Sequence, residues 1–145
     1  MASDFVFFDN NFSLRGLVFF NSLSDLGATE ERLQFNGASA VSLASDINVK
    51  FRKVILEKFK NHEISLLLGT DLLARGIDIE NLEVAINFDI PRDREAYTHR
   101  AGRTGRMGNE GSVISLVTHP EDLKKLKKFA KVSELVLKNQ ELHEK

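Results

Sequence analysis

The sequence predicts one α/β domain in which a parallel β-sheet carries helices on both of its faces. Two observations predict it. Five short apolar runs lack the polar alternation of a half-exposed strand, and amphipathic helical patterns separate them. The length of 145 residues, with 42% hydrophobic and 28% charged residues, suits a single hydrophobic core. In such a domain the crossovers are right-handed, and ligands gather beyond the carboxyl ends of the strands.

The five apolar runs are the expected strands, each buried on both faces. In chain order they are Leu17–Phe20, Ala40–Leu43, Ser65–Leu68, Val84–Phe88 and Ser112–Val117. Residues 1–14 are expected to form an N-terminal arm, so that the domain itself spans residues 15–145. Phe5–Phe8 in the arm and Val132–Leu137 near the other end are candidates for additional edge strands.

Helical patterns fill the segments between the expected strands. The clearest is a crossover helix before the third strand, with one apolar stripe made of Ile47, Phe51, Val54, Ile55 and Phe59. Another helix is expected over about Ser24–Phe35, with Leu26 and Leu33 turned inward and Gly37 as its stop signal. A third follows Thr118–Glu121, which has the pattern of a capping box.

Composition excludes several classes of protein. The absence of cysteine removes disulfides and thiolate metal sites, and the four scattered histidines predict no structural metal. No segment approaches the ~20 apolar residues that a membrane span needs. The first residues also lack the basic-then-apolar order of a signal peptide. A soluble, cytoplasmic protein that does not enter a membrane is therefore expected.

The net charge of −1 gives no global argument for nucleic-acid binding, so such a function would depend on local basic sites. One basic stretch spans residues 89–106, where five arginines outweigh three acidic residues: Arg92, Arg94, Arg100, Arg103 and Arg106. A second consists of five lysines between residues 124 and 131 on the last expected helix. For these lysines a solvated helix face is the favoured interpretation.

The strongest motif is His99-Arg-Ala-Gly-Arg-Thr-Gly-Arg106. If this segment is helical, His99, Arg103 and Arg106 share one face, whereas Arg100 points to the flank. Paired guanidiniums suit the oxygens of a γ-phosphate, whose charge redistributes during phosphoryl transfer. The two glycines of the motif would each cost a helix interior about 1 kcal/mol, and a dense anion site would explain that cost. The alternative is a surface helix whose arginines form weak ion pairs.

A second motif begins where the third expected strand ends: Gly69-Thr-Asp-Leu-Leu-Ala-Arg-Gly-Ile-Asp78. Thr70 offers a hydroxyl and backbone amides to a phosphate, and Asp78 offers a carboxylate to a ribose hydroxyl. Gly76 permits an unusual turn. Taken alone, the same residues are equally well explained as a helix cap followed by a turn.

These two motifs resemble motifs V and VI of DEAD-box ATP-dependent RNA helicases. Leu17-Val-Phe-Phe-Asn-Ser22 resembles motif IV of that family, and Asp46, Arg52 and Phe59 match the pattern around motif IVa. The resemblance covers about residues 16–117. It implies that the chain is the C-terminal RecA-like domain of such a helicase and works as a monomer.

The resemblance also implies roles for individual residues. Arg103 and Arg106 would reach the γ-phosphate of ATP, and Asp78 would lie near its ribose. His99 and Arg100 would lie at the interface with the N-terminal RecA-like lobe. RNA contacts would come from six further positions: Asn21, Ser22, Arg52, Thr70, Asp71 and Gly76.

The sequence contains neither a GxxxxGK[ST] phosphate loop nor an Asp-Glu-Ala-Asp run that would hold Mg²⁺. In this family both belong to the N-terminal lobe, which would hold ATP and Mg²⁺. The chain alone is therefore expected not to hydrolyse ATP. The start Met1-Ala-Ser, followed almost at once by a strand, is expected to mark the boundary of a fragment.

Two alternatives remain at this stage. The first is a binding module without enzymatic activity that holds RNA or a protein on the same basic surface, which a complete gene of this length would favour. The second is the equivalent lobe of a DNA helicase, because phosphate contacts do not distinguish RNA from DNA. A Ser-His-acid hydrolase is discounted, because no GxSxG nucleophile elbow is present.

Overall fold

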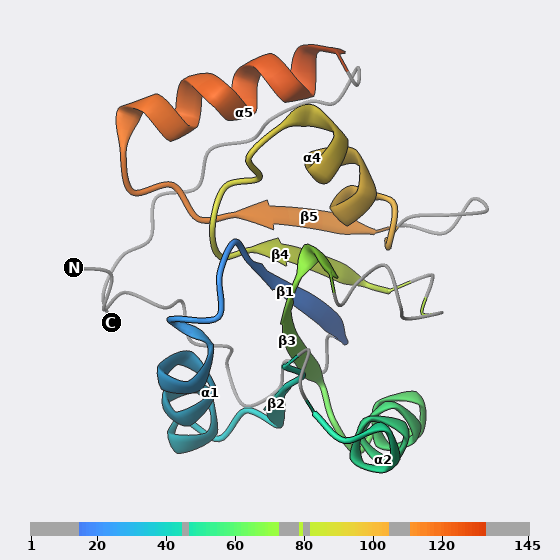
Figure 1. Ribbon diagram of the computed structural model, residues 1–145. Coiled ribbons are helices and arrows are strands. Elements are labelled where there is room, and N and C mark those ends of the chain that lie inside the picture. The colour runs from blue at the N-terminus through green and yellow to red at the C-terminus, as the bar shows by residue number, and fades with distance from the viewer. Residues whose placement is uncertain (1–14, 45–46, 73–78, 80–81, 105–110, 133–145) are drawn as a thin grey trace.

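The computed structural model describes residues 15–44, 47–72, 79, 82–104 and 111–132 (Figure 1). Their centre is a sheet of five strands in the order β2-β3-β1-β4-β5, and every neighbouring pair is parallel. The strands are β1 (Gly16–Phe20), β2 (Ala40–Ser42), β3 (Leu66–Thr70), β4 (Val84–Asn87) and β5 (Ser112–Ser115). The predicted parallel α/β sheet is confirmed, and each strand lies on or next to its expected apolar run.

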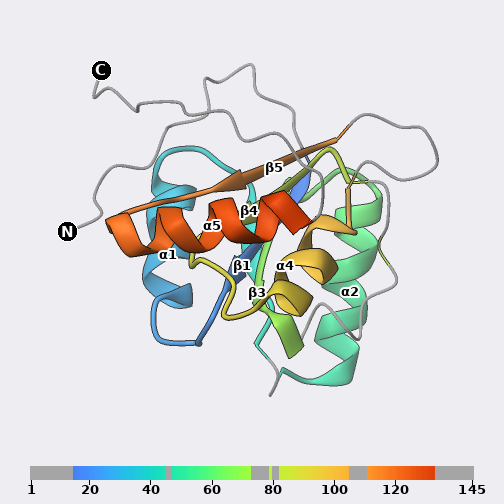
Figure 2. The ribbon, with the colours of Figure 1, turned by 90° about the horizontal axis from the view of Figure 1, so that it is seen from above.

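Helices cover both faces of the sheet, as predicted. They are α1 (Leu26–Phe35), α2 (Val49–Lys60), α4 (Arg94–Ala101) and α5 (Pro120–Val132). Figure 2 shows α1 on one side of the strands and α2 and α4 on the other. Because side chains alternate along a strand, β1 serves both layers. Leu17 and Phe19 pack with Phe59 of α2, whereas Val18 and Phe20 pack with Leu33 of α1.

The end of α1 is where the sequence predicted it. Leu26 and Leu33 are buried, and Gly37 follows the helix with φ +88°, a conformation that glycine adopts without strain. The backbone N–H of Ala38 then donates to the carbonyl of Leu33, which closes the turn. The chain therefore leaves α1 directly into β2.

The predicted apolar stripe of α2 is wrong in part. Phe59 is buried and Ile55 packs on the core, but Phe51 and Val54 are 65% and 48% exposed. Leu56, which was not in the predicted stripe, packs on the core as well. A helix buries a stripe only about 100° wide. Here the buried stripe contains Ile55, Leu56 and Phe59. Phe51 and Val54 lie beyond its edge and are therefore exposed.

The expectation for β5 also needs correction. A strand buried on both faces was predicted over Ser112–Val117, yet β5 ends at Ser115 and its residues are exposed or half-buried. Ile114 and Val117 are each 41% exposed. Within the described sheet β5 pairs only with β4, which makes it an end strand.

A third apolar cluster joins α4 to α5. It consists of Ile90, Tyr97, Leu126 and Phe129, and the rings of Tyr97 and Phe129 lie 5.8 Å apart between centroids. Burial raises the pKa of the Tyr97 phenol, because the charged form is poorly solvated there. Through this cluster α5 supports α4 from the side away from β1 (Figure 1). Among the described helices none is long and apolar enough to cross a membrane.

Candidate functional site

Three neighbouring strands deliver polar residues to one edge of the sheet. Asn21 follows β1, Asp71 follows β3, and Asn87 ends β4 with Asp89 two residues later. Since these strands are parallel, their carboxyl ends lie side by side. Helix α4 brings a fifth residue, Arg100, to the same edge. We call these five residues the edge network.

Arg100 is the centre of the edge network and is only 1% exposed. Its Nε and Nη2 donate to the two carboxylate oxygens of Asp71 at 2.7 and 2.8 Å. Nη1 donates to the Asp89 carbonyl at 2.8 Å and to Asn87 Oδ1 at 3.3 Å. Nη2 also donates to Asn21 Oδ1 at 2.8 Å. All five N–H donors of the guanidinium are therefore engaged within the domain.

The surroundings of Arg100 explain why the domain tolerates a charge in its interior. The bidentate pair with Asp71 supplies the counter-charge, and the guanidinium lies 5.3 Å from the centre of the Phe19 ring. Among the described side chains, no buried polar atom lacks a hydrogen-bond partner. A buried ion pair is stabilising only when its remaining donors and acceptors are satisfied in this way.

Asn21 fixes the start of the loop after β1. Its backbone N–H donates to the Asp89 carboxylate at 2.8 Å, and its Nδ2 donates to the Ile90 carbonyl at 3.0 Å. Arg92 donates to the Asn21 carbonyl at 3.2 Å. The Asn21 side chain is therefore occupied at both ends, by Arg100 and by Ile90.

The arrangement around Arg100 overturns one expectation from the sequence. Arg100 was expected to point to the flank of its helix and to lie at the interface with another lobe. It instead points into the domain, because Tyr97 and Arg100 form the inner side of α4. Asp71, which was expected to contact RNA, accepts hydrogen bonds from Arg100 with both of its carboxylate oxygens.

The condition that the arginine motif is helical is met only as far as Ala101. Helix α4 ends at Ala101, and Gly102 is its C-cap, with an N–H that donates to the Thr98 carbonyl. Gly102 therefore does not incur the cost of glycine in a helix interior. Because Arg103 follows the end of the helix, helical spacing does not place it on the same face as His99. Arg106 lies outside the described residues.

Arg103 and Thr104 are held by Leu82 instead. The Leu82 N–H donates to the Arg103 carbonyl at 3.0 Å, and the Thr104 hydroxyl donates to the Leu82 carbonyl. Leu82 and Thr104 also form an isolated parallel bridge, and both are buried. The backbone of Arg103 is thus held at its carbonyl by Leu82 and at its N–H by the Arg100 carbonyl. Arg103 itself is half-buried.

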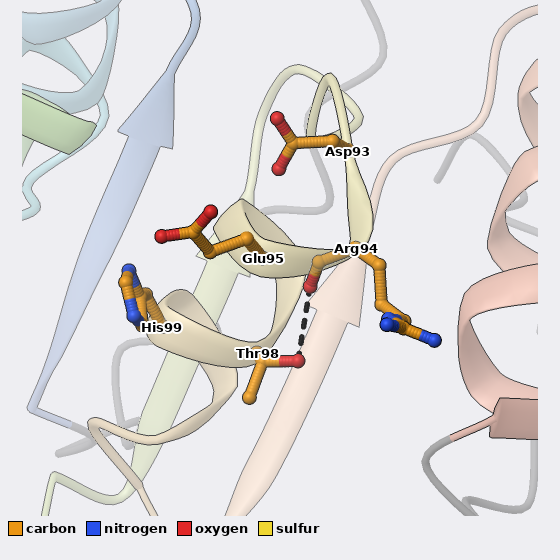
Figure 3. Close-up of a pocket in the computed structure, with 5 residues that line it drawn as sticks. All are labelled: Asp93, Arg94, Glu95, Thr98 and His99. Atoms are coloured by element: carbon orange, nitrogen blue, oxygen red, sulfur yellow. Dashed lines mark hydrogen bonds between the residues drawn. The ribbon is translucent and has the colours of Figure 1, made fainter.

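A shallow hollow lies on the outer side of α4 and is lined by Asp93, Arg94, Glu95, Thr98 and His99. Figure 3 shows Glu95 and His99 one turn apart on one flank of the helix, with Thr98 and Arg94 on the other. Asp93 caps the helix by accepting from the Ala96 N–H at 2.8 Å. His99, which was expected at the interface with another lobe, is exposed.

The remaining expected site residues fall into three groups. Ser22 and Thr70 lie at the same edge as the network; Ser22 is exposed and Thr70 is half-buried. Arg52 lies in the first turn of α2, which follows the carboxyl end of β2, and is half-buried. Gly76 and Asp78 lie outside the described residues. No group of three or more acidic, histidine or cysteine side chains in the described ranges could hold a metal ion.

Sequence reasoning missed Asn87 and Asp89. A polar residue at the end of an otherwise apolar strand was the available signal for Asn87, which is fully buried and also donates to the Ser115 hydroxyl at 2.9 Å. Asp89 acts largely through its backbone carbonyl toward Arg100, which no sequence pattern indicates.

The all-parallel sheet of five strands, with helices on both faces, defines a RecA-like α/β domain. The profile of the family described as helicase conserved C-terminal domain matches residues 3–108. The chain belongs to this family, and within it to the C-terminal domains of DEAD-box RNA helicases.

Individual relatives agree with this assignment. The chain is 41% identical over 73 residues to the ATP-dependent RNA helicase DeaD of Escherichia coli, which covers 50% of this chain and 12% of that protein. It is 37% identical over 87 residues to DeaD of Buchnera aphidicola, covering 60% and 14%. The chain therefore spans only a small part of the length of these curated relatives.

Solved structures agree as well. The C-terminal domain of the DEAD-box protein Dbp5 superposes with a TM-score of 0.76 at 28% identity, covering 83% of this chain and 70% of that one. A DEAD-box protein from Methanococcus jannaschii gives a TM-score of 0.74 at 33% identity, covering 85% and 34%.

Proposed function

We propose that this domain acts as the C-terminal lobe of an ATP-dependent RNA helicase. In this proposal Arg103 and Arg106 approach the γ-phosphate of ATP, which an N-terminal lobe holds together with Mg²⁺. Asp78 lies near the ribose of that ATP, and His99 contacts the partner lobe. Hydrolysis of ATP by the complete enzyme then accompanies RNA strand separation.

The observation that carries this proposal is the edge network. A single buried guanidinium, that of Arg100, joins the ends of β1, β3 and β4 to α4. The loop after β1, the residues after β3 and the arginine motif correspond to three separate helicase motifs. These three segments therefore share one buried support.

Arg103 is well placed for the proposed role. It follows α4 directly, three residues after Arg100, and its carbonyl is bound by Leu82. Anchoring the backbone on both sides limits where the guanidinium can move, which is the requirement for stabilising charge that develops in a transition state. The fixed, planar charge of arginine suits phosphate oxygens better than the point charge of lysine.

RNA contacts are proposed for Ser22, Thr70 and Arg52, with Gly76 as a further position. Ser22 comes two residues after β1 and is exposed, and Thr70 ends the neighbouring strand β3 and is half-buried. Asn21 and Asp71 support this surface from below, through Arg100, rather than contacting RNA with their side chains. Hydroxyl and backbone groups of this kind bind phosphates and sugars without reading bases.

Replacing Arg103 with alanine in the two-lobe protein tests the proposal. RNA-stimulated ATP hydrolysis should fall by roughly a thousandfold or more, because one charge contact to the transferring phosphoryl group is lost. RNA affinity should change little. Arg103→Lys should recover only a small part of the activity, since a lysine lacks the forked geometry.

The matched control is Arg32→Ala, which removes an exposed arginine from the last turn of α1 on the opposite face of the sheet. This variant should hydrolyse ATP at the parental rate. Near-normal turnover of Arg103→Ala, measured beside this control, would refute the arginine-finger assignment.

The preference for RNA is tested separately. Single strands of RNA and DNA with equal length and base order should be competed against each other for the two-lobe protein. RNA should bind more tightly and stimulate ATP hydrolysis more strongly, because only RNA presents 2′-hydroxyl groups. Equal competition by DNA would instead support the lobe of a DNA helicase.

A further inference from the structure

Helix α5 has one apolar side and one side occupied by lysine. Leu126, Phe129 and Ala130 are buried, and two of them pack on Tyr97 of α4. All five lysines of the helix are exposed: Lys124, Lys125, Lys127, Lys128 and Lys131. At about 100° per residue, the lysines are centred nearly opposite the apolar residues. We call their side of the helix the lysine face.

The charge of the lysine face is not balanced locally. The two acidic residues of α5, Glu121 and Asp122, both lie in its first turn, where they complement the helix dipole. Over the part of the chain that the structure describes, none of the five lysines forms a salt bridge. The chain as a whole has a net charge of −1, so positive charge is concentrated here rather than spread evenly.

The position of α5 leaves the lysine face open to a partner. In Figure 1, α5 is the outermost helix, and α4 and β5 lie on its inner side. Figure 2, seen from above, shows the whole length of α5 in front of the strands. From Lys124 to Lys131 the helix rises by about 10 Å. That rise equals the axial length of about three nucleotides of one strand in a duplex.

The chemistry of the lysine face fits phosphate groups rather than a protein surface. Protein interfaces depend on buried aromatic or apolar anchors, and lysine is depleted from their centres. None of the large hydrophobic side chains that are exposed in the described structure lies on α5. Mobile point charges without anchors instead neutralise a nucleic-acid backbone and release its counterions.

We propose that the lysine face of α5 binds the phosphate backbone of RNA, independently of base sequence and outside the surface formed by Ser22, Thr70 and Arg52. The proposal extends the proposed function, which makes RNA the ligand of this domain. The apolar side of α5 packs on α4, so RNA held on the lysine face lies across the width of α5 from α4. The lysine face thus adds salt-sensitive affinity that keeps the lobe on its substrate.

The test is the binding of the 145-residue chain to an unstructured, end-labelled single-stranded RNA, measured by fluorescence anisotropy over a range of salt concentrations. The variant Lys124→Gln/Lys127→Gln/Lys131→Gln removes one stripe of the lysine face. Each lost phosphate contact should reduce the slope of log K against log salt by about 0.7, which amounts to about 2 for the variant. Affinity at low salt should fall roughly tenfold.

The matched control, Arg32→Gln/Lys58→Gln/Lys60→Gln, removes the same charge from the last turns of α1 and α2. These turns lead to the amino ends of β2 and β3, away from the edge network. The control should keep the parental slope. Circular dichroism should show both variants folded, because all six positions are exposed.

Parental affinity and slope in the α5 variant would overturn the proposal, and so would an equal loss in both variants. If the α5 variant lost binding to a polyglutamate peptide but kept its binding to RNA, the lysine face would be assigned to an acidic protein. That result would also overturn the proposal. Failure of the proposed function is distinguishable, since it is measured by ATP hydrolysis in Arg103→Ala and by RNA affinity in Arg52→Ala. Neither of these two residues is part of α5.

Discussion

Arg100 shows how one residue can hold several motifs in place. It lies at 1% exposure, and its donors bind side chains and a carbonyl from three strand ends. Lysine at this position would supply fewer donors from a single point and could not reach both oxygens of Asp71 while binding Asn21 and Asp89. The planar guanidinium is therefore required by geometry and not only by charge.

Removing this guanidinium should strongly destabilise the domain. Arg100→Ala leaves the Asp71 carboxylate without its counter-ion and three further acceptors without donors. A loss of roughly 3–5 kcal/mol in the free energy of unfolding is expected, as for other broken buried pairs. Urea denaturation followed by circular dichroism measures it. Arg32→Ala should change stability by less than about 0.5 kcal/mol, and a similar small effect for Arg100→Ala would show that the edge network contributes little.

Two glycines should respond to alanine in opposite directions. A Cβ atom at Gly16 would collide with the side chain and carbonyl oxygen of Val84, whereas a Cβ at Gly27 meets nothing within 4 Å. Gly16→Ala should therefore destabilise the domain by forcing β1 and β4 apart. Gly27→Ala, in the first turn of α1, should be neutral or stabilising by up to about 1 kcal/mol, because alanine restricts the unfolded chain.

Thermal unfolding of both glycine variants distinguishes these outcomes. A melting temperature for Gly16→Ala at or above that of the parent chain would contradict the close approach of β1 to β4.

At the scale of elements, the end of α4 decides where Arg103 lies. The helix stops at Ala101, and Leu82 then captures the next residues through the Arg103 carbonyl and the Thr104 hydroxyl. An uninterrupted helix would have carried Arg103 onward on its surface. The short parallel bridge between Leu82 and Thr104 instead fixes the backbone just after the helix.

Thr104→Val should separate this anchoring from simple stability. Valine keeps the shape of threonine but leaves the Leu82 carbonyl without the hydroxyl donor, which should cost about 1–2 kcal/mol in unfolding free energy. In the two-lobe protein, RNA-stimulated kcat should fall further than this loss of folded protein explains, because Arg103 is less well positioned. An unchanged kcat at a temperature where the variant is fully folded would show that the anchor has no role in positioning.

At the scale of the whole molecule, the domain should be inactive by itself. Arginine contacts stabilise a transition state only where a phosphate cradle and metal ligands act from the other side. The sequence contains neither the phosphate loop nor the Asp-Glu-Ala-Asp run. With saturating RNA and Mg²⁺-ATP, the isolated chain should release no phosphate above background. Suppose that the isolated chain hydrolyses ATP and that this activity disappears in Arg103→Ala. The activity would then come from the chain itself, which would contradict the expectation.

Much of the fold followed from the sequence because it depends on local patterns. Apolar runs such as Leu66–Leu68 and the stop at Gly37 identify strands and helix ends without tertiary information. The extent of burial did not follow from the same patterns. Phe51 and Ile114 are apolar but exposed, because the rotation of α2 and the end position of β5 are set by packing against other elements.

The sequence alone determined the family, the parallel sheet and the stretches that hold the site, because motifs and periodicity are local properties of the chain. Only the tertiary structure decided what the side chains of those motifs do. Arg100 was taken for an interface residue and is a buried support, since its partners Asp71 and Asn21 lie 29 and 79 residues away in the chain. Contacts between such distant residues depend on how parallel strands bring their ends together, and no local pattern records that.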